Sequence, residues 1–125
     1  MHLDPYSRRA RSLEAAENFT MLVEEAHPAH GPRLHVAGEL DLANLSRFRR
    51  LFSKLVAERP SAIDVDISRV ELVETITAAA LLRAQAEARR HGVPVRIEGA
   101  RGSVAAMLRL AANQLSMLDQ RRDQR

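Results

Sequence analysis

Two threonines follow an apolar segment at the point where a helix is expected to begin. They lie in the motif Glu74-Thr75-Ile76-Thr77. The first turn of a helix has N–H groups without partners inside the helix, and the helix dipole places positive charge there. The Thr75 hydroxyl can therefore act as an ordinary N-cap, or it can carry a phosphate that this positive end would stabilise. The residues alone leave both interpretations open.

Two aspartates, Asp64 and Asp66, share one face of the strand before this motif. Together with Glu71 they suggest a small metal-dependent hydrolase as one alternative. The sharpest version is a phosphoacceptor receiver domain, which needs an acidic pair after its first strand and a lysine late in the chain. Glu24-Glu25 is a poor substitute for that pair, and Lys54, the only lysine, lies in the first helix. We expect no metal here, and we expect Asp66 to bond the main chain near the end of its strand.

Histidines and arginines offer two further hypotheses, a zinc site and a nucleic-acid surface. The three histidines His27, His30 and His35 lack the helical HExxH spacing of zinc enzymes. The arginines are interleaved with acids, and aromatic residues, which stack on bases, make up only 3% of the chain. The absence of cysteine excludes disulfides and thiolate metal sites. We therefore expect a binding module with no cofactor, no nucleic acid and no enzyme activity.

Length and hydropathy favour a single domain. The 125 residues are 46% hydrophobic, which is enough for a core built from aliphatic side chains. No apolar run approaches the roughly 18–20 residues that cross a bilayer, and the N-terminus lacks the apolar region of a secretory signal. These observations predict a cytoplasmic protein without membrane insertion.

Alternation of apolar and polar residues predicts about four strands. Phe19–Glu25 and Arg33–Ala37 are joined by a loop rich in proline and histidine, and they are expected to form a hairpin. Ile63, Val65 and Ile67 alternate with the two aspartates and predict a third strand. A fourth, short strand is expected over Pro94–Glu98.

Apolar residues at spacings of three and four predict three helices. The first is expected to begin at Asn44 as N-cap and to stop before Pro60, and the second to run from about Ile76 to Arg90. The third begins near Ser103. The order β-β-α-β-α-β-α indicates an α/β domain with a mixed, mostly parallel sheet. We expect a flexible segment over 1–17, the domain over 18–118 and a basic polar tail over 119–125.

Three segments of this arrangement together resemble the STAS domain of bacterial anti-sigma factor antagonists. They are Gly38-Glu39-Leu40-Asp41 after a strand, Val65–Val70 in the next strand, and Glu74–Thr77 at the following helix. The resemblance covers roughly residues 19–118. In the last motif the family has Asp-Ser-Ser-Gly, so Glu74 replaces the aspartate, Thr75 the phospho-acceptor serine and Thr77 the glycine. A β-branched residue in place of that glycine narrows the freedom of the backbone.

The resemblance implies a function in transcription regulation. The chain would sequester an anti-sigma factor of the serine/threonine kinase type, and phosphorylation of Thr75 would end the interaction. The partner-binding residues implied are Glu39, Asp41, Glu74, Ile76 and Thr77. A second copy of the chain is a further expected partner, in a homodimer. The alternative within the same fold is a STAS scaffold or accessory subunit that is not phosphorylated, in a stressosome-like assembly or beside a transporter.

Overall fold

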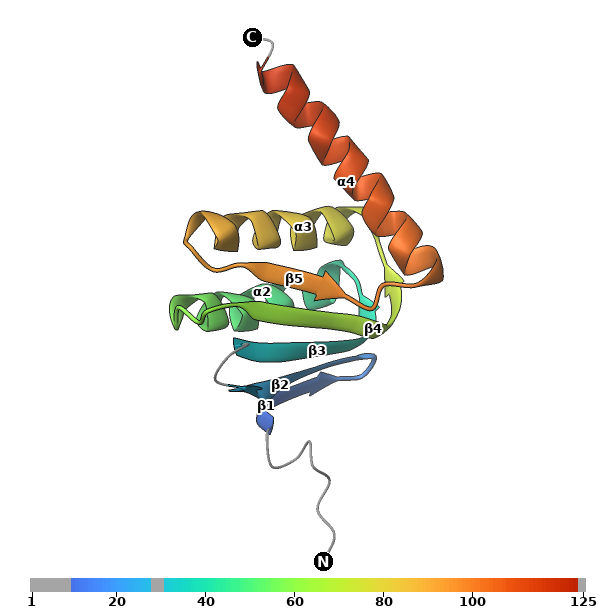
Figure 1. Ribbon diagram of the computed structural model, residues 1–125. Coiled ribbons are helices and arrows are strands. Elements are labelled where there is room, and N and C mark those ends of the chain that lie inside the picture. The colour runs from blue at the N-terminus through green and yellow to red at the C-terminus, as the bar shows by residue number, and fades with distance from the viewer. Residues whose placement is uncertain (1–9, 28–30, 124–125) are drawn as a thin grey trace, which may run out of the picture.

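The computed structural model describes residues 10–27 and 31–123, which form one mixed sheet and three helices (Figure 1). The strands lie in the spatial order β1 Ala10–Ala16, β2 Phe19–His27, β3 Gly31–Leu40, β4 Ile63–Val73 and β5 Val95–Glu98. The pairs β1–β2 and β2–β3 are antiparallel, and β3–β4 and β4–β5 are parallel. The helices are α2 Leu42–Ala57, α3 Thr75–Arg90 and α4 Gly102–Asp123. The α/β class, the hairpin and the alternation of helices with parallel strands are confirmed.

The first strand corrects the expectation of a flexible segment over 1–17. Residues 10–16 pair with β2 as β1, so the sheet has five strands where about four were expected; residues 1–9 lie outside the described ranges. The segment Arg-Ser-Leu-Glu-Ala-Ala carries little of the β-branched or aromatic signal of a strand. It becomes a strand because the edge of β2 offers unpaired N–H and C=O groups.

The start of α2 differs from the prediction by three residues. Asp41 is the N-cap, and its Oδ1 accepts a hydrogen bond from the Asn44 N–H at 2.9 Å. Asn44, predicted as the N-cap, lies inside the first turn and is 5% exposed. Aspartate and asparagine are about equally good caps, so residue type alone does not decide between Asp41 and Asn44. The choice of Asp41 follows from β3, which continues to Leu40 and leaves no room for a loop.

The helices cover one face of the sheet and bury the core there. Alternate residues of β3 and β4, among them Leu34, Val36 and Val65, are buried, while the residues between them are partly exposed on the opposite face. On the helix side, Phe48 and Phe52 of α2 stack with ring centroids 5.4 Å apart. None of the helices in the described ranges is long and apolar enough to cross a membrane.

The last helix extends past the body of the domain. α4 packs beside the start of α3 and then projects beyond it (Figure 1). From Ala112 to Arg121 every side chain except Leu115 is exposed. Residues 119–123, expected as part of a polar tail, therefore continue the helix, and residues 124–125 lie outside the described ranges.

Candidate functional site

The ends of two neighbouring strands bring the predicted site residues together. β3 and β4 run parallel, and Leu40 lies beside Val73 in their register. One residue later on each strand, Asp41 and Glu74 are the N-caps of α2 and α3. The two helix starts therefore lie at one edge of the sheet, outside the carboxyl ends of the strands, where open α/β sheets commonly bind ligands. The predicted residues at this edge are Glu39, Asp41, Glu74, Thr75, Ile76 and Thr77.

Thr77 holds the start of α3 against the end of β3. Its side chain is 0% exposed, and its Oγ1 lies 2.7 Å from the Leu40 carbonyl oxygen and 2.9 Å from that of Glu74. The same Oγ1 accepts a hydrogen bond from the Glu74 N–H at 3.0 Å. A side chain thus fixes the junction at the position where the resemblance would place a glycine. Because Thr77 is buried, it can affect a partner only by positioning the exposed residues around it.

Thr75 occupies the first position inside α3, and Glu74 is the N-cap. The N-cap interpretation of Thr75 is therefore wrong, because the hydroxyl that bonds the main chain at this helix start belongs to Thr77. The Thr75 Oγ1 lies 3.1 Å from the Met107 Sδ on α4, and the Thr75 side chain is half-buried. A thioether is a weak acceptor, so this contact can be exchanged at small cost. Thr75 presents a hydroxyl near the surface, beside α4.

Two asparagines brace the acidic residues of the site. Asn18, in the turn between β1 and β2, donates from Nδ2 to the Glu39 Oε2 at 2.6 Å. The Asn44 Nδ2 donates to the Glu39 carbonyl oxygen at 2.9 Å. Sequence reasoning missed both contacts, although a polar residue among the apolar positions of α2 was a signal that Asn44 has a bonded role. Asn18 gave no such signal, because its partner lies 21 residues away.

Two exposed apolar side chains lie at the two helix starts. Leu42 at the start of α2 is 62% exposed, and Ile76 at the start of α3 is 67% exposed. Moving large aliphatic side chains out of water lowers the free energy of the system. Two such side chains exposed at the helix starts therefore favour contact with another protein. We call Asp41, Leu42, Glu74, Thr75 and Ile76 the junction surface. It presents two carboxylates, one hydroxyl and two aliphatic groups.

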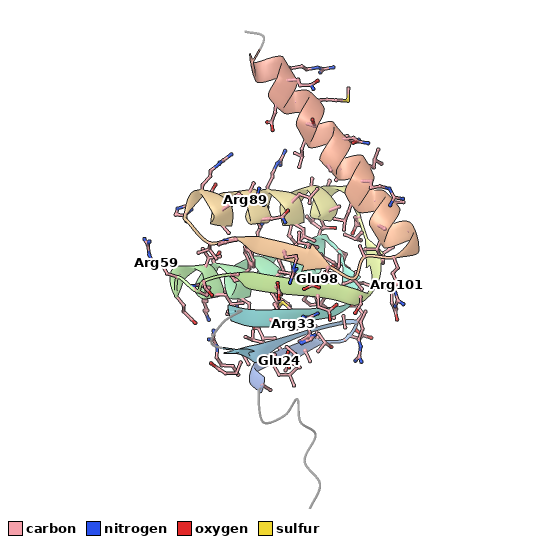
Figure 2. All side chains as sticks on the ribbon, in the orientation of Figure 1. Glu24, Arg33, Arg59, Arg89, Glu98 and Arg101 are labelled. Carbon is pink, nitrogen blue, oxygen red and sulfur yellow. The ribbon has the colours of Figure 1, made fainter. Side chains whose placement is uncertain are left out.

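The aspartates of β4 lie away from this surface, on the face of the sheet opposite to the helices. Asp66 Oδ1 accepts a hydrogen bond from the Ser68 N–H at 2.9 Å, which confirms its predicted bond to the main chain. Its other oxygen lies 3.3 Å from His35 Nδ1 and 3.7 Å from Arg33. Figure 2 shows Arg33 and Glu98 on this same face, and their side chains are 3.7 Å apart.

No metal site forms from the acids and histidines that the structure describes. Asp64 lies 3.4 Å from Arg96 and is engaged in an ion pair, while Glu71 is exposed further along β4. His35 lies between Glu24 and Asp66, and His30 lies outside the described residues. The aspartates therefore serve a charge network on the sheet.

Asp66 should make part of the stability depend on pH. Burial raises the pKa of Asp66, but hydrogen bonds from Ser68 and the charges of His35 and Arg33 outweigh this effect and lower it below the ordinary value. A lowered carboxylate pKa stabilises the fold above the unfolded-state value near ~4, and this contribution is lost as the pH falls through the folded-state pKa. The free energy of unfolding of the native chain should therefore exceed that of Asp66→Asn at pH 7, and the difference should shrink towards pH 3.

The measurement is urea unfolding of both proteins across this pH range. Glu71→Gln, at an exposed position of the same strand, is the matched control and should show a smaller pH-dependent difference. A difference between native and Asp66→Asn protein that stays constant from pH 7 to pH 3 would contradict the prediction.

The chain matches a known protein family and several solved structures. The family model described as "Mlab, STAS domain" matches residues 23–114. No curated protein sequence matches the chain. Among solved structures, the STAS domain of an antisigma-factor antagonist from Rhodobacter sphaeroides is 26% identical with a TM-score of 0.59, and the match covers 68% of this chain and 90% of that one.

Two further solved structures share this architecture. An anti-sigma factor antagonist from Mycobacterium paratuberculosis is 25% identical with a TM-score of 0.54, and the match covers 86% of each chain. The anti-sigma factor antagonist SpoIIAA in its unphosphorylated form is 12% identical with a TM-score of 0.57, covering 71% of this chain and 81% of that one. At that identity SpoIIAA supports the fold alone.

Proposed function

The chain belongs to the STAS domain family, and from this premise we propose that it is a non-catalytic module that sequesters an anti-sigma factor of the serine/threonine kinase type. The observation that carries the proposal is the junction surface, where two adjacent helix starts each expose an aliphatic side chain, Leu42 on α2 and Ile76 next to Thr75 on α3. Two solved structures about a quarter identical to the chain are described as anti-sigma factor antagonists. In this proposal the module acts in the cytoplasm and regulates transcription by releasing a sigma factor.

Phosphorylation of Thr75 would switch the interaction off. The partner would transfer the γ-phosphoryl group of its ATP to Oγ1, its catalytic base would take the hydroxyl proton, and ADP would leave. The phosphate adds about −1.5 to −2 charges at pH 7, beside the carboxylates of Glu74 and Asp41. The start of α3 tolerates this charge because its N–H groups and dipole favour anions. A partner surface shaped for a neutral hydroxyl does not tolerate the charge of the phosphate. Phosphorylation would therefore end binding and leave the fold intact.

Charge at Thr75 should therefore abolish partner binding. Against a candidate kinase-type anti-sigma factor, we expect Thr75→Glu to weaken binding at least about tenfold, since a charge would be buried without a partner. Thr75→Ser keeps the hydroxyl and is the matched control, expected to bind like the native chain and to gain one phosphate in intact-mass spectrometry with ATP. The switch would be overturned if Thr75→Glu bound the partner as tightly as the native chain does and the native chain gained no phosphate.

A constitutive STAS accessory subunit is the second candidate function. The half-burial of the Thr75 side chain beside α4 favours it, because a kinase acts on a hydroxyl that its active site can reach. Ile76→Glu tests whether the junction surface is used at all, and under both candidate functions it should weaken partner binding. Adding ATP then separates the two functions, because only the phosphorylation switch predicts that ATP releases the partner.

A further inference from the structure

A groove separates α2 and α3 on the side of the helices that faces away from the sheet. Its volume is about 580 Å³, within the roughly 300–1,000 Å³ typical of ligand sites. On each helix the lining residues recur at spacings of three and four, from Arg49 to Ala57 on α2 and from Ala80 on α3 to its C-cap His91. Phe52 and Val56 form one apolar wall. Alanines of α3 form the other, and their small side chains let a second chain approach closely.

The two helices that bound this groove are strongly basic. Within its bounds α2 carries Arg47, Arg49, Arg50 and Lys54 and no acid. Within its bounds α3 carries Arg83, Arg89 and Arg90 and one acid, Glu87. Glu87 also lines the groove, and its carboxylate lies 3.1 Å from Arg90 and 3.7 Å from His91. The net charge of the whole chain is only +3, whereas these two helices together carry seven basic residues and one acid.

We propose that the groove binds an acidic amphipathic helix of a partner protein. Such a helix would place apolar side chains at i, i+3/i+4 and i+7 between the walls and its carboxylates against the cations on both sides. The lined stretch corresponds to about 12–17 Å of helix, or two to three turns of the partner. Arg49 lines the groove from α2 and Arg83 from α3, so each wall supplies a cation.

The placement of the cations favours a helix over other anionic ligands. Arg49 and Arg83 lie on opposite walls of the groove, so a ligand between the walls meets a cation on each side. A nucleic-acid strand would need stacking aromatics, and the one aromatic residue that lines the groove, Phe52, is 5% exposed and stacked on Phe48. The α4 end of a second copy is itself mostly basic, with Arg109 and Arg121 against Asp119, so it lacks charge complementarity.

The test uses a synthetic peptide of about 14 residues, or roughly 21 Å of helix, with leucines at i, i+3/i+4 and i+7 and glutamates on both flanks. Binding is measured by fluorescence anisotropy, and the site is mapped by amide chemical shifts of the isotope-labelled chain. We expect shifts at the groove walls and at least about tenfold tighter binding than for the same peptide with lysine in place of glutamate.

Charge reversal on the walls is the decisive variant. Arg49→Glu with Arg83→Glu should weaken binding of the acidic peptide at least about tenfold. Arg47→Glu with Arg89→Glu is the matched control, because it changes the net charge equally at exposed positions that do not line the groove. Figure 2 shows Arg89 pointing away from the sheet. The control pair should weaken binding of the acidic peptide by less than about threefold. Ala84→Leu, which fills the groove without changing charge, should also weaken binding.

Three outcomes would overturn the proposal: no binding of the acidic peptide at millimolar concentration, equal binding of the lysine peptide, or equal losses in the wall and control pairs. Anionic phospholipid vesicles are tested in parallel, and vesicle binding without peptide binding would also overturn it. The lined part of α3 begins at Ala80, beyond the junction surface, and the probe does not involve Thr75. If the groove does not bind the peptide, the proposed switch at Thr75 is unaffected. If Thr75 is not a switch, the proposed groove is likewise unaffected.

Discussion

Replacing Gly38 with alanine is expected to destabilise the domain by roughly 3–5 kcal/mol. Gly38 has φ +95°, and a Cβ added there would lie 2.2 Å from the Asn18 carbonyl oxygen. That oxygen accepts a hydrogen bond from the Glu39 N–H at 2.9 Å, so moving it away would break a bond that joins β3 to the turn between β1 and β2. Urea or thermal unfolding of Gly38→Ala measures the loss.

Gly92→Ala is the matched control for this prediction. Gly92 has φ +83°, close to that of Gly38, but an added Cβ would meet nothing within 4 Å. Its replacement should therefore cost only the left-handed backbone strain, about 1–2 kcal/mol. If the two variants lost equal stability, the close approach of Gly38 to Asn18 would not be the cause.

Gly38 also shows why part of the site could be predicted from the sequence. The motif Gly38–Asp41 resembles a family motif, and the structure gives it a physical meaning. The glycine allows the β1–β2 turn to approach, Glu39 is held by that turn, and Asp41 begins α2. Gly38, Glu39 and Asp41 form one short motif, so a local pattern reveals them, although the turn that contacts them lies about 20 residues earlier.

The fold followed from local patterns wherever burial alternates strongly. β3 and β4 bury every second residue over most of their length, and α2 buries apolar residues at helical spacing. β1 was missed because it lies at the edge of the sheet, where pairing with β2 outweighs its weak strand propensity. The projecting end of α4 was missed because its polar residues resemble a tail in composition.

The contacts that decide the site join residues far apart in the chain. Thr75 meets Met107, which is 32 residues away, and Thr77 meets Leu40, which is 37 residues away. No spacing rule predicts such pairs in the absence of the tertiary structure. From the sequence, Thr77 was a departure from glycine that narrows the backbone; in the structure it is a buried hydrogen-bonding group that fixes the junction surface.

Thr77→Val should destabilise the domain by about 1–3 kcal/mol. Valine fills nearly the same space but has no hydroxyl, so it leaves the Leu40 carbonyl without the threonine donor and the Glu74 N–H without its acceptor. Thr77→Ser keeps the hydroxyl and loses only a methyl group, so it should retain most of the stability, about 1 kcal/mol below the native chain. Chemical unfolding of the three proteins measures the series.

The same series separates positioning from contact at the junction surface. Thr77 is fully buried, so a loss of partner binding in Thr77→Val can only come from movement of the exposed residues that its bonds hold, such as Ile76. Binding should therefore weaken in the valine variant and recover in the serine variant, under conditions where both remain folded. Equal unfolding free energies for the valine and serine variants would show that the hydroxyl does not hold α3 to β3, and the packing of α3 on the sheet would then be the stronger constraint on this site.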